Sequence, residues 1–179
     1  MKIERIRVGE LECNCYFIDI DGNLLIIDPG DEFDKIKNKI GNRNVVGIIV
    51  THYHFDHVGA LKDLLDEYKV NVYDRNNMNE GVNIIDRFRF EVIYTPGHKE
   101  DLITIYFRED KCMFCGDLIF RDSIGRCDLP GGDTKEMIES INTIKEYDND
   151  IVIYSGHGDN TTLGYEKKNN VYFLNGEYI

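Results

Sequence analysis

The chain has 179 residues, of which 42% are hydrophobic and 30% charged, and its formal net charge is −12. This length suits one domain over residues 1–179, with a core large enough to need no disulfide bonds. The acidic balance argues against a nucleic-acid partner, because phosphate binding needs clustered Lys and Arg. No apolar run reaches the length of a membrane span or of a signal-peptide core, so we expect no membrane partner and a soluble, cytoplasmic protein.

Apolar periodicity divides the first half of the chain into strands and helices. It predicts strands at 3–8, 15–20, 24–27, 45–50 and 70–73, and helices at 31–40 and 60–68. Asp21-Gly22-Asn23 predicts a hairpin turn between the second and third strands. The polar, Asn-rich stretch 75–82 predicts a loop.

The second half repeats this theme. It predicts strands at 88–94, 103–107, 112–114 and 151–154, and one helix at 134–147 that buries Met137, Ile138, Ile141 and Ile144. This order of elements predicts an α/β (α+β) fold with two facing mixed sheets and helices outside them.

One short stretch between a predicted strand and a predicted helix concentrates ligand-type side chains. It reads Thr51-His52-Tyr53-His54-Phe55-Asp56-His57. These imidazoles and this carboxylate cannot all point one way on a strand or a helix, but a loop can fold them around one centre. Neutral imidazole and carboxylate are ligands that zinc and iron accept, so the stretch predicts a metal site.

Three further ligand-type residues follow predicted strands in the same way. They are His98 after the strand that ends at 94, Asp117 after the strand 112–114, and His157 after the strand 151–154. We expect the four strand ends to converge on one edge of a sheet. All five histidines of the chain then belong to one site.

The five cysteines favour reduced thiols, since the number is odd and no signal peptide is expected. Cys13 and Cys15, with Cys112 and Cys115, have the spacing of a thiolate metal site. Both pairs fall on predicted strands, so we expect them to pack as small apolar residues. Cys127 is expected near the pocket.

The chain resembles the metallo-beta-lactamase fold superfamily and, within it, the glyoxalase II-like (hydroxyacylglutathione hydrolase-like) hydrolases. The residues that carry the resemblance run in order along nearly the whole chain: Asn14-Cys15-Tyr16, Ile27-Asp28-Pro29-Gly30, the histidine stretch, Thr95-Pro96-Gly97-His98, Gly116-Asp117, Gly125-Arg126-Cys127-Asp128, Ser155-Gly156-His157-Gly158, and Thr161, Thr162 and Glu166. A single HxHxDH stretch is moderately specific, whereas the complete ordered set is strong.

The resemblance implies an αββα sandwich with two divalent metal ions between its halves. It implies that His52, His54 and His98 bind the first metal, that Asp56, His57 and His157 bind the second, and that Asp117 bridges the two. Zinc is the first expectation, with iron and manganese as alternatives. The implied reaction is hydrolysis of a small-molecule thioester or ester, such as S-lactoylglutathione, by a metal-bridging hydroxide that Asp56 orients or deprotonates.

Three further residues are candidates for support or substrate contact. Asp28 either holds the outer nitrogen of a metal-bound imidazole or forms a turn before Pro29. Thr51 is expected to anchor the ligand loop through its hydroxyl. Arg126 either meets an acidic substrate or pairs with Asp128, and the pairing is favoured.

Two departures from the family concern the thiol part of the substrate. Glyoxalase II proteins carry a C-terminal helical region that binds glutathione, and we expect this chain, which ends at Ile179, to lack it. Lys99-Glu100-Asp101-Leu102 follow His98, where the family usually has Thr-Pro-Gly-Ser.

Three alternatives to thioester hydrolysis remain open. One is a persulfide dioxygenase-like oxidoreductase with a single iron on His52, His98 and Asp117. Another is a metal hydrolase of a different small ester or lactone, and the third is a non-catalytic metal-binding module. The oligomeric state is not predicted.

Overall fold

The first half of the chain forms a five-stranded mixed sheet. This computed structural model describes residues 1–174. The sheet has the strand order β1-β2-β3-β4-β5, and its strands are β1 (Lys2–Val8), β2 (Cys13–Ile20), β3 (Asn23–Ile27), β4 (Asn44–Ile49) and β5 (Val72–Tyr73). The first three strands form an antiparallel meander, while β4 and β5 run parallel to β3. The parallel pairs need crossover connections, and the helices α1 (Phe33–Ile40) and α3 (Leu61–Tyr68) lie in them.

The second half forms a six-stranded mixed sheet with the order β13-β12-β9-β8-β7-β6. Its strands are β6 (Gly81–Ile85), β7 (Phe88–Tyr94), β8 (Ile103–Phe107), β9 (Cys112–Gly116), β12 (Val152–Ser155) and β13 (Thr161–Thr162). Only the β12–β9 pair of this sheet is parallel, and α4 (Thr134–Lys145) lies in the crossover connection that a parallel pair requires. The small hairpin β10 (Ile119–Phe120) and β11 (Ser123–Ile124) stands apart from both sheets.

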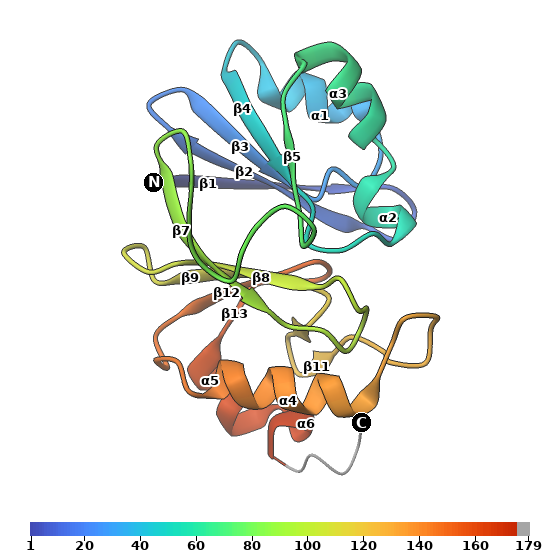
Figure 1. Cartoon of the computed structure of the whole chain (residues 1–179), viewed down its shortest axis with the longest axis vertical. Helices are drawn as coiled ribbons and strands as arrows, with labels where there is room; N and C mark the ends of the chain where they lie inside the picture. Colours follow the sequence, from blue (N-terminus) through green and yellow to red (C-terminus); the bar gives the residue numbers. More distant parts are fainter. Residues whose placement is uncertain (175–179) are drawn as a thin grey trace.

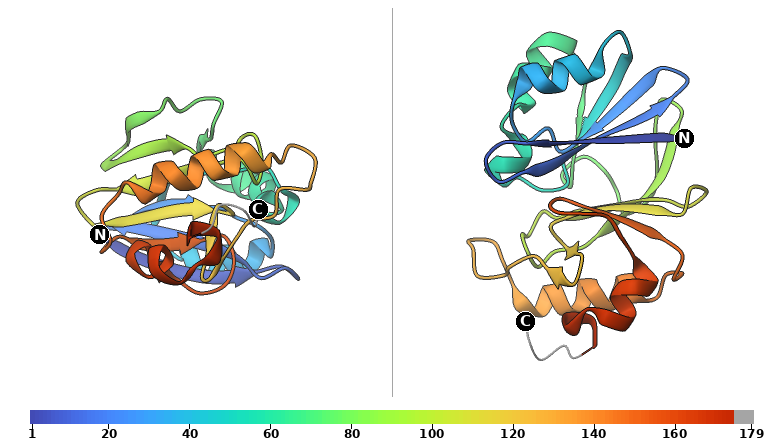
Figure 2. Two further views of the ribbon diagram at one scale, coloured as in Figure 1. Left: turned by 90° about the horizontal axis from the view of Figure 1, so that it is seen from below. Right: turned by 180° about the vertical axis from the view of Figure 1, so that it is seen from behind.

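The two sheets face each other, and helices cover their outer faces (Figure 1). One apolar cluster fills the space between the sheets, with Tyr16, Ile27, Phe90 and Phe114 among its members. A second cluster joins α4 to the six-stranded sheet, and a third joins α1 and α3 to the five-stranded sheet. This layering confirms the predicted pair of mixed sheets and the αββα sandwich. Figure 2 shows the same layers from below and from behind.

The C-terminal helices α5 (Leu163–Asn169) and α6 (Val171–Leu174) lie on the same side of the six-stranded sheet as α4 (Figure 1). Glu166 in α5 is fully buried and accepts hydrogen bonds from the Asp122 N–H, the Thr161 hydroxyl and the Asn170 amide. These contacts tie the helix to the β10–β11 hairpin. In residues 1–174, no helix combines the length and the apolar character that crossing a membrane requires.

Several local predictions were incomplete or wrong. The stretch 75–82 was predicted as a loop, but β6 begins at Gly81 and extends the second sheet. Ile138 was predicted to be buried on its helix, yet it is half-buried, and Ser140 lies on the buried face and donates to the Pro96 carbonyl. Asp133 caps this helix by accepting hydrogen bonds from the Lys135 and Glu136 N–H groups, and the helix ends at Lys145 rather than at 147.

The cysteines behave as predicted from their strand positions. All five are free, and Cys13, Cys15, Cys112 and Cys115 are buried in the apolar clusters. Burial raises the pKa of the Cys112 and Cys115 thiols to about 12. They therefore stay protonated and pack as apolar groups.

Candidate metal centre

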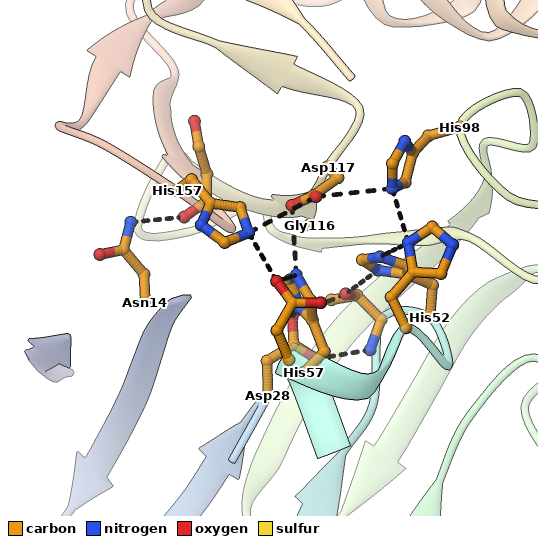
Figure 3. Close-up of polar contacts among 12 residues, drawn as sticks. Asn14, Asp28, His52, His57, His98, Gly116, Asp117 and His157 are labelled. Atoms are coloured by element: carbon orange, nitrogen blue, oxygen red, sulfur yellow. Dashed lines mark hydrogen bonds and ion pairs between the residues drawn. The ribbon is translucent and has the colours of Figure 1, made fainter. Parts of the chain in front are cut away.

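Four strand ends meet at one edge of the sandwich and bring all the predicted ligand-type residues together. The segment after β4 carries His52 and His54, and β7, β9 and β12 are followed by His98, Asp117 and His157 respectively. Figure 3 shows the side chains of His52, His98, Asp117 and His157 pointing toward a common centre from both sheets. The convergence expected from the sequence is therefore present.

Part of the predicted loop is helical. Phe55–Val58 forms the short helix α2, so that Asp56 and His57 lie on one helical turn while His52 and His54 precede it in extended backbone. This corrects the prediction that a loop carries all four side chains. The turn is closed by a hydrogen bond from the His57 N–H to the His54 carbonyl.

Three imidazoles form a first cluster. The Nδ1 atom of His54 lies 3.2 Å from Nε2 of His52 and 2.9 Å from Nε2 of His98. The outer nitrogens of the other two rings have partners that fix their tautomers. Nδ1 of His98 donates to the Arg126 carbonyl at 2.7 Å, and Nδ1 of His52 lies 3.2 Å from the Thr51 hydroxyl, which itself donates to Asp28.

These tautomers leave lone pairs facing each other. A neutral imidazole has one N–H, so a ring that donates through Nδ1 presents a lone pair at Nε2. Nε2 of His52 and Nε2 of His98 both face the single Nδ1 of His54, which has at most one proton to donate. At least one buried lone pair is left unsatisfied, and a cation at this point satisfies all three.

Two imidazoles and two carboxylates form a second cluster. Nε2 of His57 lies 3.3 Å from Oδ1 of Asp117, and Nε2 of His157 lies 3.1 Å from Oδ2 of Asp56. Both rings use their Nδ1 elsewhere: His57 on Asp28 at 2.9 Å, and His157 on the Leu11 carbonyl at 2.9 Å. Nε2 of His57 and Oδ1 of Asp117 are buried without a hydrogen-bond partner. Neutral rings in these tautomers would point the Nε2 lone pairs of His57 and His157 at the carboxylate oxygens of Asp117 and Asp56, so a positive charge, either a proton or a metal ion, is favoured between them.

Asp117 lies between the two clusters. Its Oδ1 faces His57, while its Oδ2 lies 3.5 Å from Nε2 of His98 and 3.6 Å from Nε2 of His157. Burial raises the pKa of this carboxyl, but the charge and hydrogen bond of His57 outweigh burial and hold its pKa below the usual range. Asp117 is thus an ionised carboxylate that faces both clusters.

The donor set fits divalent metal ions. Sets of His52, His54 and His98, and of His52, His57 and Asp117, each present ligand atoms that lie within 4.8 Å of one another. Nitrogen and oxygen donors of this kind suit zinc, iron and manganese. The orphaned lone pairs show that the arrangement is better satisfied with cations than by internal hydrogen bonds.

Comparison with known proteins identifies the family. The family model of the metallo-beta-lactamase superfamily matches residues 8–75 and 79–157. The chain belongs to the metallo-beta-lactamase superfamily. This membership supports the coarser sequence prediction of a metal-dependent hydrolase.

Individual superfamily members are similar over nearly their whole length. The hydroxyacylglutathione hydrolase GloC of Haemophilus influenzae is 33% identical over 212 residues, covering 99% of this chain and all of that protein. The solved structure of the BLEG-1 B3 metallo-beta-lactamase superposes with a TM-score of 0.92 at 28% identity, covering 96% of this chain and 99% of that one. The structure of TTHA1623 in a di-iron-bound form gives a TM-score of 0.87 at 29% identity, covering 94% and 99%.

Within this superfamily site, Asp28 holds both the loop and a ring. The carboxylate is buried and accepts three hydrogen bonds: from the Thr51 N–H at 2.8 Å, from the Thr51 hydroxyl at 2.6 Å and from Nδ1 of His57 at 2.9 Å. Asp28 also has a φ of 53°, directly before Pro29. The hydrogen bond to His57 is the supporting contact considered for Asp28, and Thr51 anchors the loop through its hydroxyl.

Arg126 pairs with Asp128, as favoured from the sequence. Its Nε and Nη2 donate to the two carboxylate oxygens at 2.6 and 2.7 Å. Its guanidinium is exposed, and only its backbone carbonyl touches the ligand set, through His98.

Several supporting contacts were not predicted. The Asn14 amide donates to the Ser155 and Gly158 carbonyls, and the Tyr16 hydroxyl donates to the Ser155 carbonyl at 2.6 Å, so β2 fixes the segment that carries His157. The Asn14-Cys15-Tyr16 motif was the available signal for these contacts. Gly156 is required for close approach, because a Cβ there would lie 2.1 Å from Oδ1 of Asp117.

The unusual segment after His98 also supports the ligand loop. Oδ2 of Asp101 accepts a hydrogen bond from the Tyr53 N–H at 3.1 Å, and Oδ1 of Asp101 lies 3.5 Å from the Lys99 ammonium. The Asp101 carboxylate thereby fixes the backbone between His52 and His54. The acidic segment acts at least in part on the loop itself.

Proposed function

We propose that this chain is a dinuclear metal-dependent hydrolase of small thioesters, of the glyoxalase II-like type. In this proposal His52, His54 and His98 hold one divalent ion, Asp56, His57 and His157 hold the second, and Asp117 bridges them. Zinc is the first choice of metal, with iron or manganese as alternatives.

The observation that carries the proposal is the direction of the inner lone pairs. In four of the five rings the outer nitrogen has a hydrogen-bond partner, which leaves the inner nitrogen as a ligand. Asp117 faces both clusters, with Oδ1 toward His57 and Oδ2 between His98 and His157, which suits a bridging carboxylate. The similarity to a named hydroxyacylglutathione hydrolase over the full length of both chains supports the thioester substrate.

The chemistry then divides between the metals and the chain. When bound, two divalent ions lower the pKa of water and polarise an acyl carbonyl, so that no Ser or Cys nucleophile is needed. Burial raises the pKa of the Asp56 carboxyl, but the hydrogen bond with His157 and the charges of the nearby imidazoles outweigh burial. The pKa of Asp56 therefore lies below its usual value, and Asp56 stays ionised. In this proposal the ionised Asp56 accepts a hydrogen bond from the attacking water and orients it, and because its lowered pKa makes it a weak base, the orienting role is favoured over proton abstraction.

The remaining residues hold this geometry. Asp28 and Thr51 fix the rings of His57 and His52, and the Leu11 and Arg126 carbonyls fix His157 and His98. Such outer partners keep each imidazole in the tautomer that can bind a metal.

The test combines metal content with turnover. Elemental analysis of untagged protein purified without added metal is expected to give about two metals per chain, and the same protein is expected to hydrolyse S-lactoylglutathione. Asp117→Ala and His57→Ala are expected to lose metal and activity together, whereas Asp66→Ala, on an exposed face of α3, is expected to keep both.

Two results would overturn the proposal. Full metal content and full turnover in Asp117→Ala would refute the ligand assignment. One iron per chain, with oxygen consumption on a persulfide and no thioester hydrolysis, would instead establish the dioxygenase alternative.

A further inference from the structure

Two large apolar side chains project into solvent beside the metal centre. Phe55 is 76% exposed, more than any other large hydrophobic residue in residues 1–174, and Leu11 is 53% exposed. Phe55 directly precedes Asp56 in α2, and the Leu11 carbonyl accepts the hydrogen bond from His157. Leaving such side chains in water costs free energy that burial against a ligand recovers.

Both side chains line the same cavity. It has a volume of about 360 Å³ and is lined by Val8, Gly9, Glu10, Leu11, Gly30, Asp31, Phe55, Asp56 and Gly59. Asp56 belongs to the second cluster, so the cavity borders the candidate metal centre. Its volume falls in the range of small-molecule sites.

The chain holds Leu11 in place before any ligand arrives. The turn between β1 and β2 is closed by a hydrogen bond from the Glu12 N–H to the Gly9 carbonyl, and the Gly9 N–H donates to the Glu32 carboxylate at 3.0 Å. Gly9 and Glu12 both have positive φ, which makes the turn tight. A fixed apolar group loses little entropy on binding, so it adds to affinity more effectively than a mobile one.

Charge decides which part of a thioester fits this cavity. Glu10, Asp31 and Asp56 are the ionisable residues that line it, and all three are acidic. A thiol part that carries carboxylates, as glutathione does, is repelled there. An uncharged apolar group meets Leu11 and Phe55 without that penalty.

From this arrangement we propose that Leu11 and Phe55 form the acyl-binding wall of the site, and that among thioesters the site favours those whose acyl group is apolar and larger than acetyl. This inference rests on the proposed thioesterase function and adds the substrate class to it. The thiol part then lies away from the cavity, on the side of His98.

The experiment uses one neutral thiol and varies only the acyl group. The metal-loaded full chain is assayed with the acetyl, butanoyl, hexanoyl and phenylacetyl thioesters of N-acetylcysteamine. Burial of one methylene is worth about fourfold in kcat/KM, so we expect a rise along the linear series and a high value for phenylacetyl. In Leu11→Ser and Phe55→Ser the hexanoyl-to-acetyl ratio of kcat/KM is expected to fall severalfold, with metal content unchanged.

The chain offers matched controls. Val82 and Ile84 on β6 are 53% and 66% exposed and lie on the edge strand of the second sheet, outside the cavity. Val82→Ser and Ile84→Ser are expected to keep the wild-type ratio. A hexanoyl-to-acetyl ratio near one in the wild type would overturn the inference, and so would an equal fall of this ratio in Val82→Ser and Ile84→Ser. Hydrolysis of the acetyl thioester would in either case leave the hydrolase function intact.

A binding measurement separates this inference from the function on which it rests. Calorimetry with the non-hydrolysable thioether S-hexyl-N-acetylcysteamine is expected to show binding to the wild-type chain and several-fold weaker binding to Phe55→Ser. If the thioether binds in this way but no thioester, including S-lactoylglutathione, is hydrolysed, the function fails and the apolar site stands. If thioesters are hydrolysed but the thioether binds both proteins equally, the apolar site fails alone.

Discussion

Asp28 is the residue on which the two parts of the ligand loop depend. Its two oxygens hold the Thr51 backbone, the Thr51 hydroxyl and the His57 ring. Asp28→Asn keeps the size but replaces one acceptor oxygen by a donor, so one of the three hydrogen bonds must break. We expect metal affinity to fall by about 10- to 100-fold, as for other groups that hold metal-bound histidines.

Competition with a chelator of known affinity measures this effect. Asp34→Asn, at an exposed position in the first turn of α1, is the control and is expected to bind metal as the wild type does. Equal affinity in the Asp28 and Asp34 variants would show that the ring needs no such support.

The two clusters are expected to differ in how metal binding depends on pH. Burial lowers the pKa of His57, but the buried carboxylates Asp117 and Asp28 outweigh burial and raise its pKa well above the ordinary value. Burial, followed by the charges of the neighbouring imidazoles, holds the pKa of His52 well below that value. In the metal-free protein His57 therefore keeps its proton near neutral pH, and His52 does not.

A metal that binds His57 must displace its proton, so protons compete with the metal and a higher pH favours metal binding at the second cluster. The apparent affinity of the second cluster is expected to rise with pH, by up to about tenfold per unit below the His57 pKa, while that of the first cluster stays nearly flat. Titration of the metal-free protein with zinc between about pH 6 and pH 8 tests this, because the range spans the ordinary histidine value. Two equally flat profiles would contradict the assignment of a proton to His57.

At the scale of elements, Glu4 joins β1 to α1. Its carboxylate accepts hydrogen bonds from the Lys39 ammonium at 2.6 Å and from Arg43 at 2.8 Å. The hydrogen bond from Lys39 is the main cause that lowers the pKa of Glu4 to about 2. Because this folded-state pKa lies below the unfolded one, the stabilisation is present above about pH 4.3 and is lost as the pH falls through about 2.

Glu4→Gln is accordingly expected to lower the free energy of unfolding by about 1 kcal/mol at pH 7, a modest value because the group is near solvent. The difference from the wild type should shrink toward zero as the pH approaches 2. Urea unfolding at several pH values provides the measurement, with the exposed Glu109→Gln as control. A difference that does not depend on pH would assign the effect to packing instead of charge.

The elements with a clear apolar period were predictable from the sequence, and the others were not. Strands such as β3, β7 and β8, and the helices α1, α3 and α4, show continuous or periodic burial. β6 was not predicted, because Gly81 and Asn83 disfavour strands. Its pairing with β7 decides its conformation instead. β10, β11 and β13 have two residues each, too few to show any period.

The candidate site divides in the same way. The side chains at the strand ends were predictable, because His and Asp can be recognised in the sequence as residue types that bind metal ions. The groups that orient them include the Leu11 and Arg126 carbonyls, and every residue has a backbone carbonyl. Only the folded chain shows which ones are used.

At the scale of the molecule, the proposed ligands come from both halves of the sandwich. His52, His54, Asp56 and His57 follow the five-stranded sheet, whereas His98, Asp117 and His157 follow strands of the six-stranded sheet. A bound metal therefore links the halves and stabilises only the folded state. At a free metal concentration of 1,000 times Kd the stabilisation is about 4 kcal/mol, which corresponds to a rise in Tm of roughly 10 °C.

Chelation is expected to reverse this stabilisation. Adding EDTA should lower the Tm of the purified protein by several degrees and change that of Asp117→Ala much less. Thermal unfolding followed by circular dichroism provides the readout. An unchanged Tm in the wild type would show that the halves hold together equally well without metal.

The contact between the Leu11 carbonyl and His157 also bears on how the protein is made. These residues are 146 positions apart, and the same two regions are joined by the Asn14 N–H, which donates to the Gly156 carbonyl, and by the Tyr16 hydroxyl, which donates to the Ser155 carbonyl. During synthesis the ribosome releases the histidine loop long before it releases His157. A nascent chain can therefore assemble the first cluster only after His98 emerges and the second only after His157 emerges, so a product terminated before His157 lacks the complete set of proposed ligands.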